Sequence, residues 1–229
     1  MKNLEDFEVL YERASNRKGG DEGLEAIVSE PLNDHDVSEL PDSFVLSELS
    51  KKVFQSGFVW RVVRNKWPEF EEVFFGFDID KLLMMPPDML ERKASDERII
   101  RNLRKVKSIQ NNALMIDDIR REHGSIAQWI SDWPGENIVG LWEELKKKGD
   151  RLGGNTGPYA LRAIGKDTFL LSRDVEAYFR NHKLIDGGLR TKKSLATIQS
   201  CFNNWQDQSG RSLQAISQII SYGIGDNFV

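Results

Sequence analysis

A cluster of glycines at residues 152–158 is the part of the sequence best suited to bind a ligand, because it reads Leu-Gly-Gly-Asn-Thr-Gly-Pro. Glycine has no Cβ, so its backbone N–H groups can approach a ligand closely. A short helix is expected directly after the cluster, and a helix N-terminus presents further N–H groups and the positive end of its dipole. The pattern predicts a phosphate-binding turn, with an ordinary tight turn between helices as the alternative. Its members would be Gly153, Gly154, Thr156 and Gly157.

An aromatic segment at residues 54–60, Phe-Gln-Ser-Gly-Phe-Val-Trp, could hold a planar ring. Aromatic faces attract a cationic ring by roughly 0.5–2 kcal/mol once water is excluded. From the residues alone, however, Trp60 and Phe58 are expected in the core beside the valines of the same stretch.

Positive charge is concentrated at residues 98–107, which hold five lysines and arginines and no acid. The chain as a whole has a net charge of −4, which weighs against nucleic-acid binding, where a basic surface is expected. A local basic face on an acidic protein is nevertheless compatible with DNA. Arg101 and Lys105 are its candidate contacts, and a solvated helix face is the alternative.

Length and composition are those of an ordinary globular protein, at 229 residues with 39% hydrophobic and 30% charged residues. No apolar run approaches the roughly 20 residues needed to span a bilayer, and no signal peptide begins the chain, so we expect a cytoplasmic protein with no membrane partner. The single cysteine, Cys201, excludes a disulfide framework and a cysteine-rich zinc site. The three histidines have no metal-ligand spacing, so no metal site is predicted.

Apolar residues recur at helical spacing along most of the chain, and strand patterns are weak. The fold class predicted is therefore all-α, with many short helices in two lobes that flank a cleft. We expect one domain over residues 1–229, with an N-terminal helical extension to about residue 42. Its clearest long helix is predicted at residues 96–122. Other helices are expected at 4–14, 22–29, 44–56, 58–66, 69–75, 78–85, 87–93, 125–133, 137–148, 173–182, 191–207 and 212–222.

Three segments together resemble the DNA-3-methyladenine glycosylase I family of the helix-hairpin-helix DNA glycosylase superfamily. They are SKKVFQSGFVWRVV at 50–63, ERIIRNLRKVKSIQNNA at 97–113 and LKKKGDRLGGNTGPY at 145–159. The resemblance extends over residues 43–180. It implies a monomeric enzyme of base excision repair that binds double-stranded DNA with damaged bases and excises alkylated bases of the 3-methyladenine type. Base flipping and hydrolysis of the N-glycosidic bond would be its mechanism.

The resemblance also assigns site residues, and this chain departs from the family at several of them. It implies that Trp60 stacks on the base, with support from Phe58 and Gln55, and the alternative is that both aromatic rings are core residues. The family's base-contacting glutamate, eight residues before the pocket tryptophan Trp60, is Lys52 here. Glu48 lies one helical turn before Lys52 and could replace that acid or pair with the lysine. The superfamily's catalytic aspartate aligns with Ser172, so Asp174 is the candidate catalytic carboxylate, and the alternative is a helix N-terminal residue that offsets the dipole.

The zinc site typical of the family cannot form with one cysteine, although a monovalent cation on the hairpin carbonyls is compatible with the sequence. Superfamily members with lyase activity use a hairpin lysine, and residues 155–159 contain none, so a monofunctional glycosylase is expected. One alternative is a non-catalytic DNA-binding relative that kept the hairpin but lost base excision. Another is a helical interaction protein without a nucleic-acid role.

Overall fold

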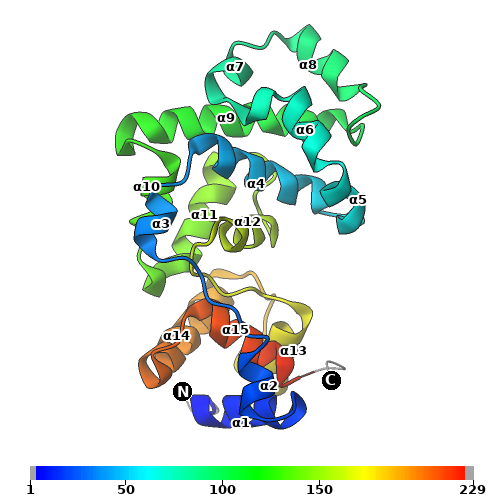
Figure 1. Ribbon diagram of the computed structural model, residues 1–229. Helices are drawn as coiled ribbons and strands as arrows, with labels where there is room; N and C mark the ends of the chain where they lie inside the picture. The colour runs from blue at the N-terminus through cyan, green and yellow to red at the C-terminus, as the bar shows by residue number, and fades with distance from the viewer. Residues whose placement is uncertain (1–3, 225–229) are drawn as a thin grey trace. The chain divides into compact units, whose positions relative to one another are not determined.

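The computed structural model describes residues 4–224, and these residues are helical with no strand (Figure 1). This confirms the all-α prediction. The described chain divides into two compact units, which are considered one at a time. We call residues 32–133 and 140–166 the central unit, and residues 4–31, 134–139 and 167–224 the terminal unit. Within residues 4–224, no helix is long and apolar enough to cross a membrane.

The central unit holds most of the short helices. Its elements are α3 (Asp34–Ser38), α4 (Asp42–Gln55), α5 (Trp60–Asn65), α6 (Trp67–Val73), the 3₁₀ turn η1 (Phe75–Phe77), α7 (Ile79–Leu83), α8 (Pro87–Ala94), α9 (Leu103–His123), α10 (Ile126–Ser131), most of α11 (Ile138–Lys148) and α12 (Thr156–Ile164).

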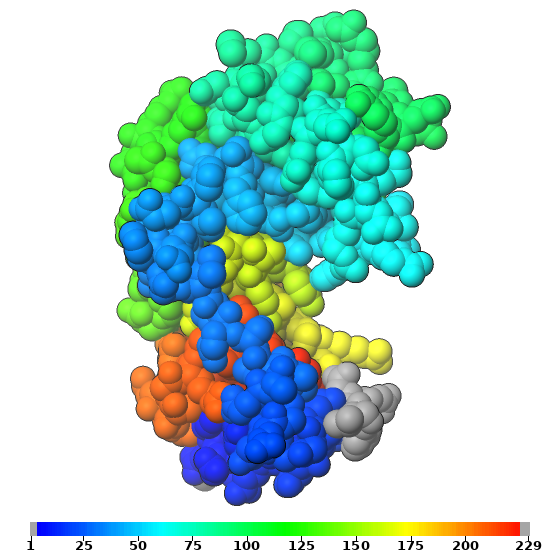
Figure 2. Space-filling view, in the orientation of Figure 1, coloured from blue at the N-terminus to red at the C-terminus, as the bar shows by residue number. Residues whose placement is uncertain are grey.

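Helix α4 lies at the centre of this unit, against α9, α10 and α12 (Figure 1). Its residues Leu46, Leu49 and Phe54 have no exposed surface, because they meet apolar faces from several helices at once. Phe54 also packs edge-on against Phe70 of α6, with ring centroids 4.6 Å apart. These contacts fix the direction in which the chain leaves the end of α4. In the space-filling view α5 and α6, in cyan, reach the surface of the central unit (Figure 2).

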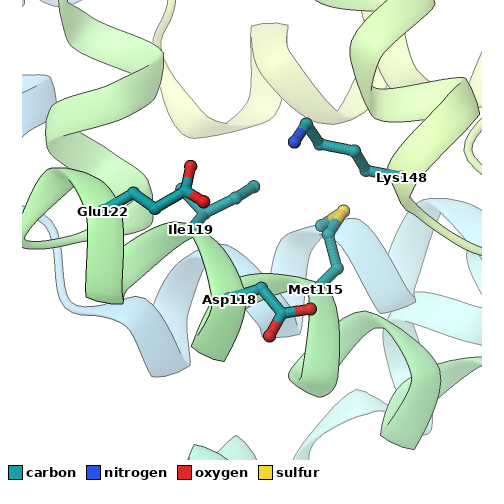
Figure 3. Close-up of a pocket in the computed structure, with 5 residues that line it drawn as sticks. All are labelled: Met115, Asp118, Ile119, Glu122 and Lys148. Atoms are coloured by element: carbon teal, nitrogen blue, oxygen red, sulfur yellow. The ribbon is translucent and has the colours of Figure 1, made fainter.

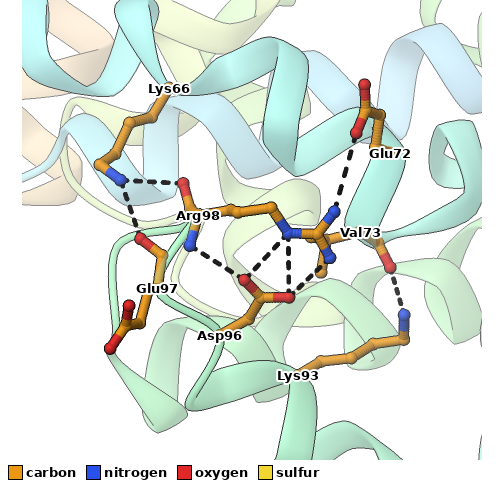
Figure 4. Close-up of polar contacts among 7 residues, drawn as sticks. All are labelled: Lys66, Glu72, Val73, Lys93, Asp96, Glu97 and Arg98. Atoms are coloured by element: carbon orange, nitrogen blue, oxygen red, sulfur yellow. Dashed lines mark hydrogen bonds and ion pairs between the residues drawn. The ribbon is translucent and has the colours of Figure 1, made fainter.

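The long helix α9 begins at Leu103, so our prediction of a start at residue 96 was wrong. The Asp96 carboxylate accepts a hydrogen bond from the Arg98 N–H at 2.9 Å and binds the Arg98 guanidinium as well (Figure 4). The Lys66 ammonium donates to the carbonyls of Glu97 and Arg98 at 3.1 and 2.9 Å. Such side-chain bonds offer the backbone an alternative to the helix. The helix begins only where the Asn102 side chain caps it.

The terminal unit contains α1 (Phe7–Arg17), α2 (Asp21–Glu25), η2 (Gly135–Asn137), α13 (Arg173–Asn181), α14 (Lys192–Ser209) and α15 (Leu213–Tyr222). Aromatic residues form its core, with Phe169 and Phe202 stacked at 4.1 Å between centroids. The expected N-terminal extension is divided between the units, since α1 and α2 belong here and α3 belongs to the central unit. This division depends on contacts between residues distant in sequence, and helical periodicity carries no information about such contacts.

Candidate functional site

A cavity of about 210 Å³ in the central unit brings together two of the predicted segments. It lies between the end of α4, the turn that follows, the first residue of α5 and the start of α12. Residues from 50–63 and 145–159, nearly 100 positions apart, therefore share one site. The lining residues are Lys52, Gln55, Ser56, Gly57, Trp60, Asn155, Thr156 and Tyr159.

Trp60 forms the aromatic wall of this cavity. It is 40% exposed, unlike the core residue Trp67, which is 4% exposed. The Tyr159 ring meets it edge-on at 5.3 Å with an interplanar angle of 90°. This T-shaped contact fixes one side of the Trp60 indole, while the indole as a whole stays at the protein surface. Tyr159 was not singled out from the sequence, where it stood only as part of the glycine-rich turn.

Gln55 is the most informative polar residue of the site. Its side chain is 2% exposed, yet its Oε1 atom has no hydrogen-bond partner. A buried polar atom without a partner costs about 1–3 kcal/mol, and at the wall of a cavity such an atom is a candidate ligand contact. A ligand N–H that entered the cavity would supply the missing partner.

Lys52 supplies the positive charge of the cavity. Its Nζ lies 5.5 Å from the centre of the Trp60 ring. Burial lowers the pKa of Lys52, the carboxylate of Glu48 opposes that shift, and the charges of Lys51 and Arg64 add to it. The ion pair of Glu48 is with Lys51, three residues on, instead of the i,i+4 pair with Lys52 that we considered. Glu48 does not line the cavity.

Phe58 is also outside the cavity lining. It is 45% exposed and its neighbour Val59 is 62% exposed. Both follow Gly57, whose φ of +69° lets the chain turn sharply between α4 and α5. Phe58 and Val59 therefore present an apolar surface immediately before Trp60 in the chain.

The glycine-rich turn joins α11 to α12 and is the predicted hairpin. The N–H of Gly157 donates to the Leu152 carbonyl at 3.1 Å, and the N–H of Thr156 donates to the Gly153 carbonyl at 3.3 Å. These two N–H groups are used inside the turn, which corrects our expectation that both would point at a phosphate. A Cβ at position 157 would lie 2.8 Å from the Leu152 carbonyl oxygen, so close packing requires glycine there.

Gly153 and Gly154 differ from the other two positions. Among the described residues, no backbone carbonyl accepts a hydrogen bond from either N–H group. Gly154 has a φ of +65°, which glycine adopts without strain. Their role in phosphate binding stays a prediction. It now rests on these two donors and on the dipole of α12, because Thr156 and Gly157 use their N–H groups inside the turn and Pro158 has none.

Two asparagines of α9 hold the hairpin in place. The Asn112 side chain exchanges two hydrogen bonds with the backbone of Asp150, at 2.7 and 3.1 Å. Asn111 donates to the Asp150 carboxylate at 2.8 Å. Sequence reasoning missed this pairing. The available signal was a polar residue, Asn112, within the apolar face of α9, where it has no exposed surface.

The two basic candidates lie in different settings. Arg101 is exposed in the segment before α9. The Lys105 ammonium instead donates to the carbonyls of Phe54 and Ser56 at 3.1 and 2.7 Å, so it binds the last carbonyls of α4. This structural role was not expected. DNA contact by either residue remains a prediction.

Asp174, the candidate catalytic acid, lies in the first turn of α13 in the terminal unit and is partly buried. Ser172 caps the same helix, since its hydroxyl accepts from the Val175 N–H at 3.2 Å. It also shares a hydrogen bond with Ser221 at 3.1 Å. A serine at position 172 therefore has a structural function. Within residues 4–224, no cluster of histidine, cysteine and acidic residues could hold a metal ion.

A second cavity of about 210 Å³ lies between α9 and the end of α11 in the central unit (Figure 3). It is lined by Met115, Asp118, Ile119, Glu122 and Lys148. Lys148 reaches across toward the α9 side chains (Figure 3). None of these five residues carries a buried polar atom without a partner, so the first cavity is the better candidate for a ligand.

Solved structures of similar fold are DNA glycosylases. A variant of 3-methyladenine DNA glycosylase I in complex with 3-methyladenine is 20% identical, with a TM-score of 0.51 over 69% of this chain and 95% of that chain. The 8-oxoguanine DNA glycosylase of Methanocaldococcus jannaschii is 15% identical, with a TM-score of 0.57 over 94% and 93%. That of Thermotoga maritima is 17% identical, with a TM-score of 0.51 over 97% and 98%. The protein therefore has the fold of the helix-hairpin-helix DNA glycosylases.

The family follows from the sequence. The model of the methyladenine glycosylase family matches residues 37–152, just over half of the chain, a range that includes the α4–α5 wall of the cavity. The chain belongs to the methyladenine glycosylase family, and it is a DNA repair glycosylase, a hydrolase of N-glycosyl bonds.

Proposed function

We propose that the α4–α12 cavity receives an alkylated purine flipped out of duplex DNA, and that the protein hydrolyses the bond between this base and its sugar. One observation carries the proposal. An exposed tryptophan, Trp60, and a buried amide oxygen without a partner, on Gln55, line the same cavity beside the hairpin. An aromatic face and an unused hydrogen-bonding atom are what a flipped base requires.

The energy of flipping sets what the cavity must supply. Extruding a nucleotide costs a few kcal/mol of stacking and pairing. Stacking on an aromatic side chain contributes about 1–3 kcal/mol per base. A hydrogen bond to the Gln55 amide oxygen adds to this, because it also removes the cost of leaving that atom unpaired. Together these contacts are of the size needed to hold the base.

The DNA backbone would be held beside the cavity. The N–H groups of Gly153 and Gly154, together with the positive end of the α12 dipole, suit a phosphate. The exposed apolar surface of Phe58 and Val59 suits the gap that the flipped base leaves, since apolar side chains are often inserted between base pairs. Arg101 would contact a further phosphate.

The chemical step would use water as the nucleophile. As the glycosidic bond breaks, positive charge develops on the sugar, and a carboxylate stabilises such a transition state. Asp174 is the candidate for this role. Residues 155–159 contain no lysine, so the reaction ends with an abasic site and no strand break. One chain supplies both hairpin and cavity, and we propose that it acts as a monomer.

The test is the release of free base from duplex oligonucleotides that each carry one alkylated purine. Trp60→Ala is expected to reduce the single-turnover rate by about 5- to 150-fold, because about 1–3 kcal/mol of stacking is lost. Phe44→Ala is the control, since Phe44 is a similarly exposed aromatic, 39% against 40%, that does not line the cavity. Equal rates for both variants and the wild type would reject the cavity as the base site.

A further inference from the structure

The charge of the cavity distinguishes one class of alkylated purine from another. Among its eight lining residues, Lys52 carries the one formal charge, and no carboxylate is present. The nearest acid along α4, Glu48, is bound to Lys51. A base that stacks on Trp60 would lie close to the Lys52 ammonium, since 5.5 Å separates that nitrogen from the ring centre.

The two helix ends at the cavity add to the positive potential. Helix α12 begins at Thr156, so its positive end faces the site. Helix α4 ends at Gln55, and its negative end would offset this. However, the Lys105 ammonium already binds the carbonyls of Phe54 and Ser56 there. The cavity is therefore positive from both its side chains and its backbone.

This potential has opposite effects on two kinds of base. A purine methylated at N3 or N7 is a cation in the nucleotide, and Lys52 repels it. A purine alkylated on an exocyclic oxygen or nitrogen is uncharged, and its ring nitrogens can accept a hydrogen bond. Such a base would accept from the Lys52 ammonium and donate to the unpartnered Oε1 of Gln55.

We propose that this glycosylase prefers alkylated purines that are uncharged in DNA over cationic ones, and that Lys52 is the catalytic general acid that protonates the departing base. The inference rests on the proposed function, because it assumes that the base enters this cavity. The O-alkylated guanines belong to this substrate class, because they are uncharged and keep an exocyclic amino group that can donate to the Gln55 oxygen.

The chemistry explains why an uncharged base needs such a residue. When the glycosidic bond breaks, its electron pair goes to the base, so a cationic base leaves neutral without help. An uncharged base would leave as an anion unless a proton arrives. Here the proton passes from Nζ of Lys52 to a ring nitrogen of the base. Water adds to the sugar C1′ and gives up a proton to solvent, and the amine is then reprotonated from solvent.

The setting of Lys52 suits proton transfer. A general acid works best when its pKa lies near the working pH. Burial lowers the pKa of Lys52, with Lys51 and Arg64 acting in the same direction and Glu48 against it. From α12 the titratable group that faces it is the Tyr159 phenol. The ammonium form is required, so release of an uncharged base should fall as the pH rises through the pKa of Lys52, which lies below the ordinary value of 10.5.

The experiment compares two duplexes under single turnover, one with O-methylated guanine and one with N7-methylated guanine. For each duplex, the rate of base release by the wild type is divided by the rate of spontaneous loss of the same base. We expect this ratio to be at least tenfold larger for the uncharged base than for the cationic base. Lys52→Met should lower release of the uncharged base by about 10²–10⁴-fold, the usual contribution of a general acid, and remove the alkaline fall in rate. Lys81→Met is the control, because Lys81 is an exposed lysine of α7 that neither lines the cavity nor acts on the charge of Lys52.

Each outcome has a distinct meaning. A wild-type preference for the cationic base overturns this inference and leaves the proposed function in place. Equal losses on both bases for Lys52→Met also overturn it, since a structural defect would act on both. The wild-type ratio needs no variant, so poor folding of Lys52→Met does not block the test. No release from any alkylated duplex would overturn the inference and the proposed function together.

Discussion

At the scale of single residues, the site depends on side chains whose burial lowers the free energy of unfolding. The Gln55 amide oxygen is buried without a partner, and Lys52 is a partly buried cation on the preceding turn of the same helix. Neither arrangement stabilises the folded protein. Both arrangements are explained if a bound base supplies the missing hydrogen-bond partner and an acceptor for the ammonium. Stability is commonly lost where function needs unpaired groups.

Gln55→Leu tests this trade-off. Removing the unpaired oxygen should leave the free energy of unfolding unchanged or raise it by up to about 1–3 kcal/mol, while base release slows. Urea unfolding and single-turnover rates measure the two effects. Gln214→Leu is the control for the rate, because Gln214 also has a buried, unpartnered Oε1 but lies in α15 of the terminal unit. Its stability should fall, since its Nε2 donates to Ser29. A Gln55→Leu protein with the wild-type rate would show that the amide does not touch the base.

Several residues of the cavity could be predicted from the sequence. Trp60, Gln55 and Lys52 lie within eight residues of one another, so a single motif reports them. Tyr159 was missed because its contact with Trp60 spans nearly 100 positions, and no local pattern records such a pair. The packing role of Gly157 was missed for a similar reason, since its close neighbour is the Leu152 carbonyl. DNA contact at Gly157 stays a prediction.

At the scale of helices, α9 positions both walls of the site. Asn112 holds the hairpin through Asp150, and Lys105 holds the end of α4 through two carbonyls. The start of this helix could not be predicted from periodicity. Its apolar pattern continues back to Ile99, but the side chains of Asp96 and Lys66 bind the backbone there. Contacts from outside the segment decided where the helix begins.

Lys105→Met separates a structural role from a DNA contact. Losing two hydrogen bonds from a charged group should destabilise the protein by roughly 1–3 kcal/mol and slow base release, because the turn before Trp60 loses its anchor. Arg104→Met, at an exposed neighbouring position of α9, is the control and should change neither quantity. Thermal or urea unfolding gives the first measurement. Unchanged stability with weaker DNA affinity would instead favour a phosphate contact at Lys105.

At the scale of the whole molecule, a net charge of −4 has to be reconciled with a polyanionic partner. The basic residues of 98–107 and the α12 N-terminus lie in the central unit. We therefore expect DNA to bind through a local basic surface of this unit. Such binding still releases counterions, so it should weaken with salt.

The predicted salt dependence can be measured on an undamaged duplex. The logarithm of the association constant should fall linearly with the logarithm of salt concentration, and Arg101→Ala should reduce the slope by about one. Arg92→Ala is the control, since Arg92 is exposed but paired with Asp88 at 3.1 Å. Affinity that does not respond to salt would argue against phosphate contacts.

The central claim is that the cavity presents a flipped, alkylated purine for hydrolysis. The most direct measurement is the yield of free base and of abasic sites from one duplex with a single alkylated purine. We predict equal yields of both, with intact strands and no covalent adduct after borohydride treatment. Tight binding of the damaged duplex without release of any base would contradict the claim, and would indicate a DNA-binding relative that has lost catalysis.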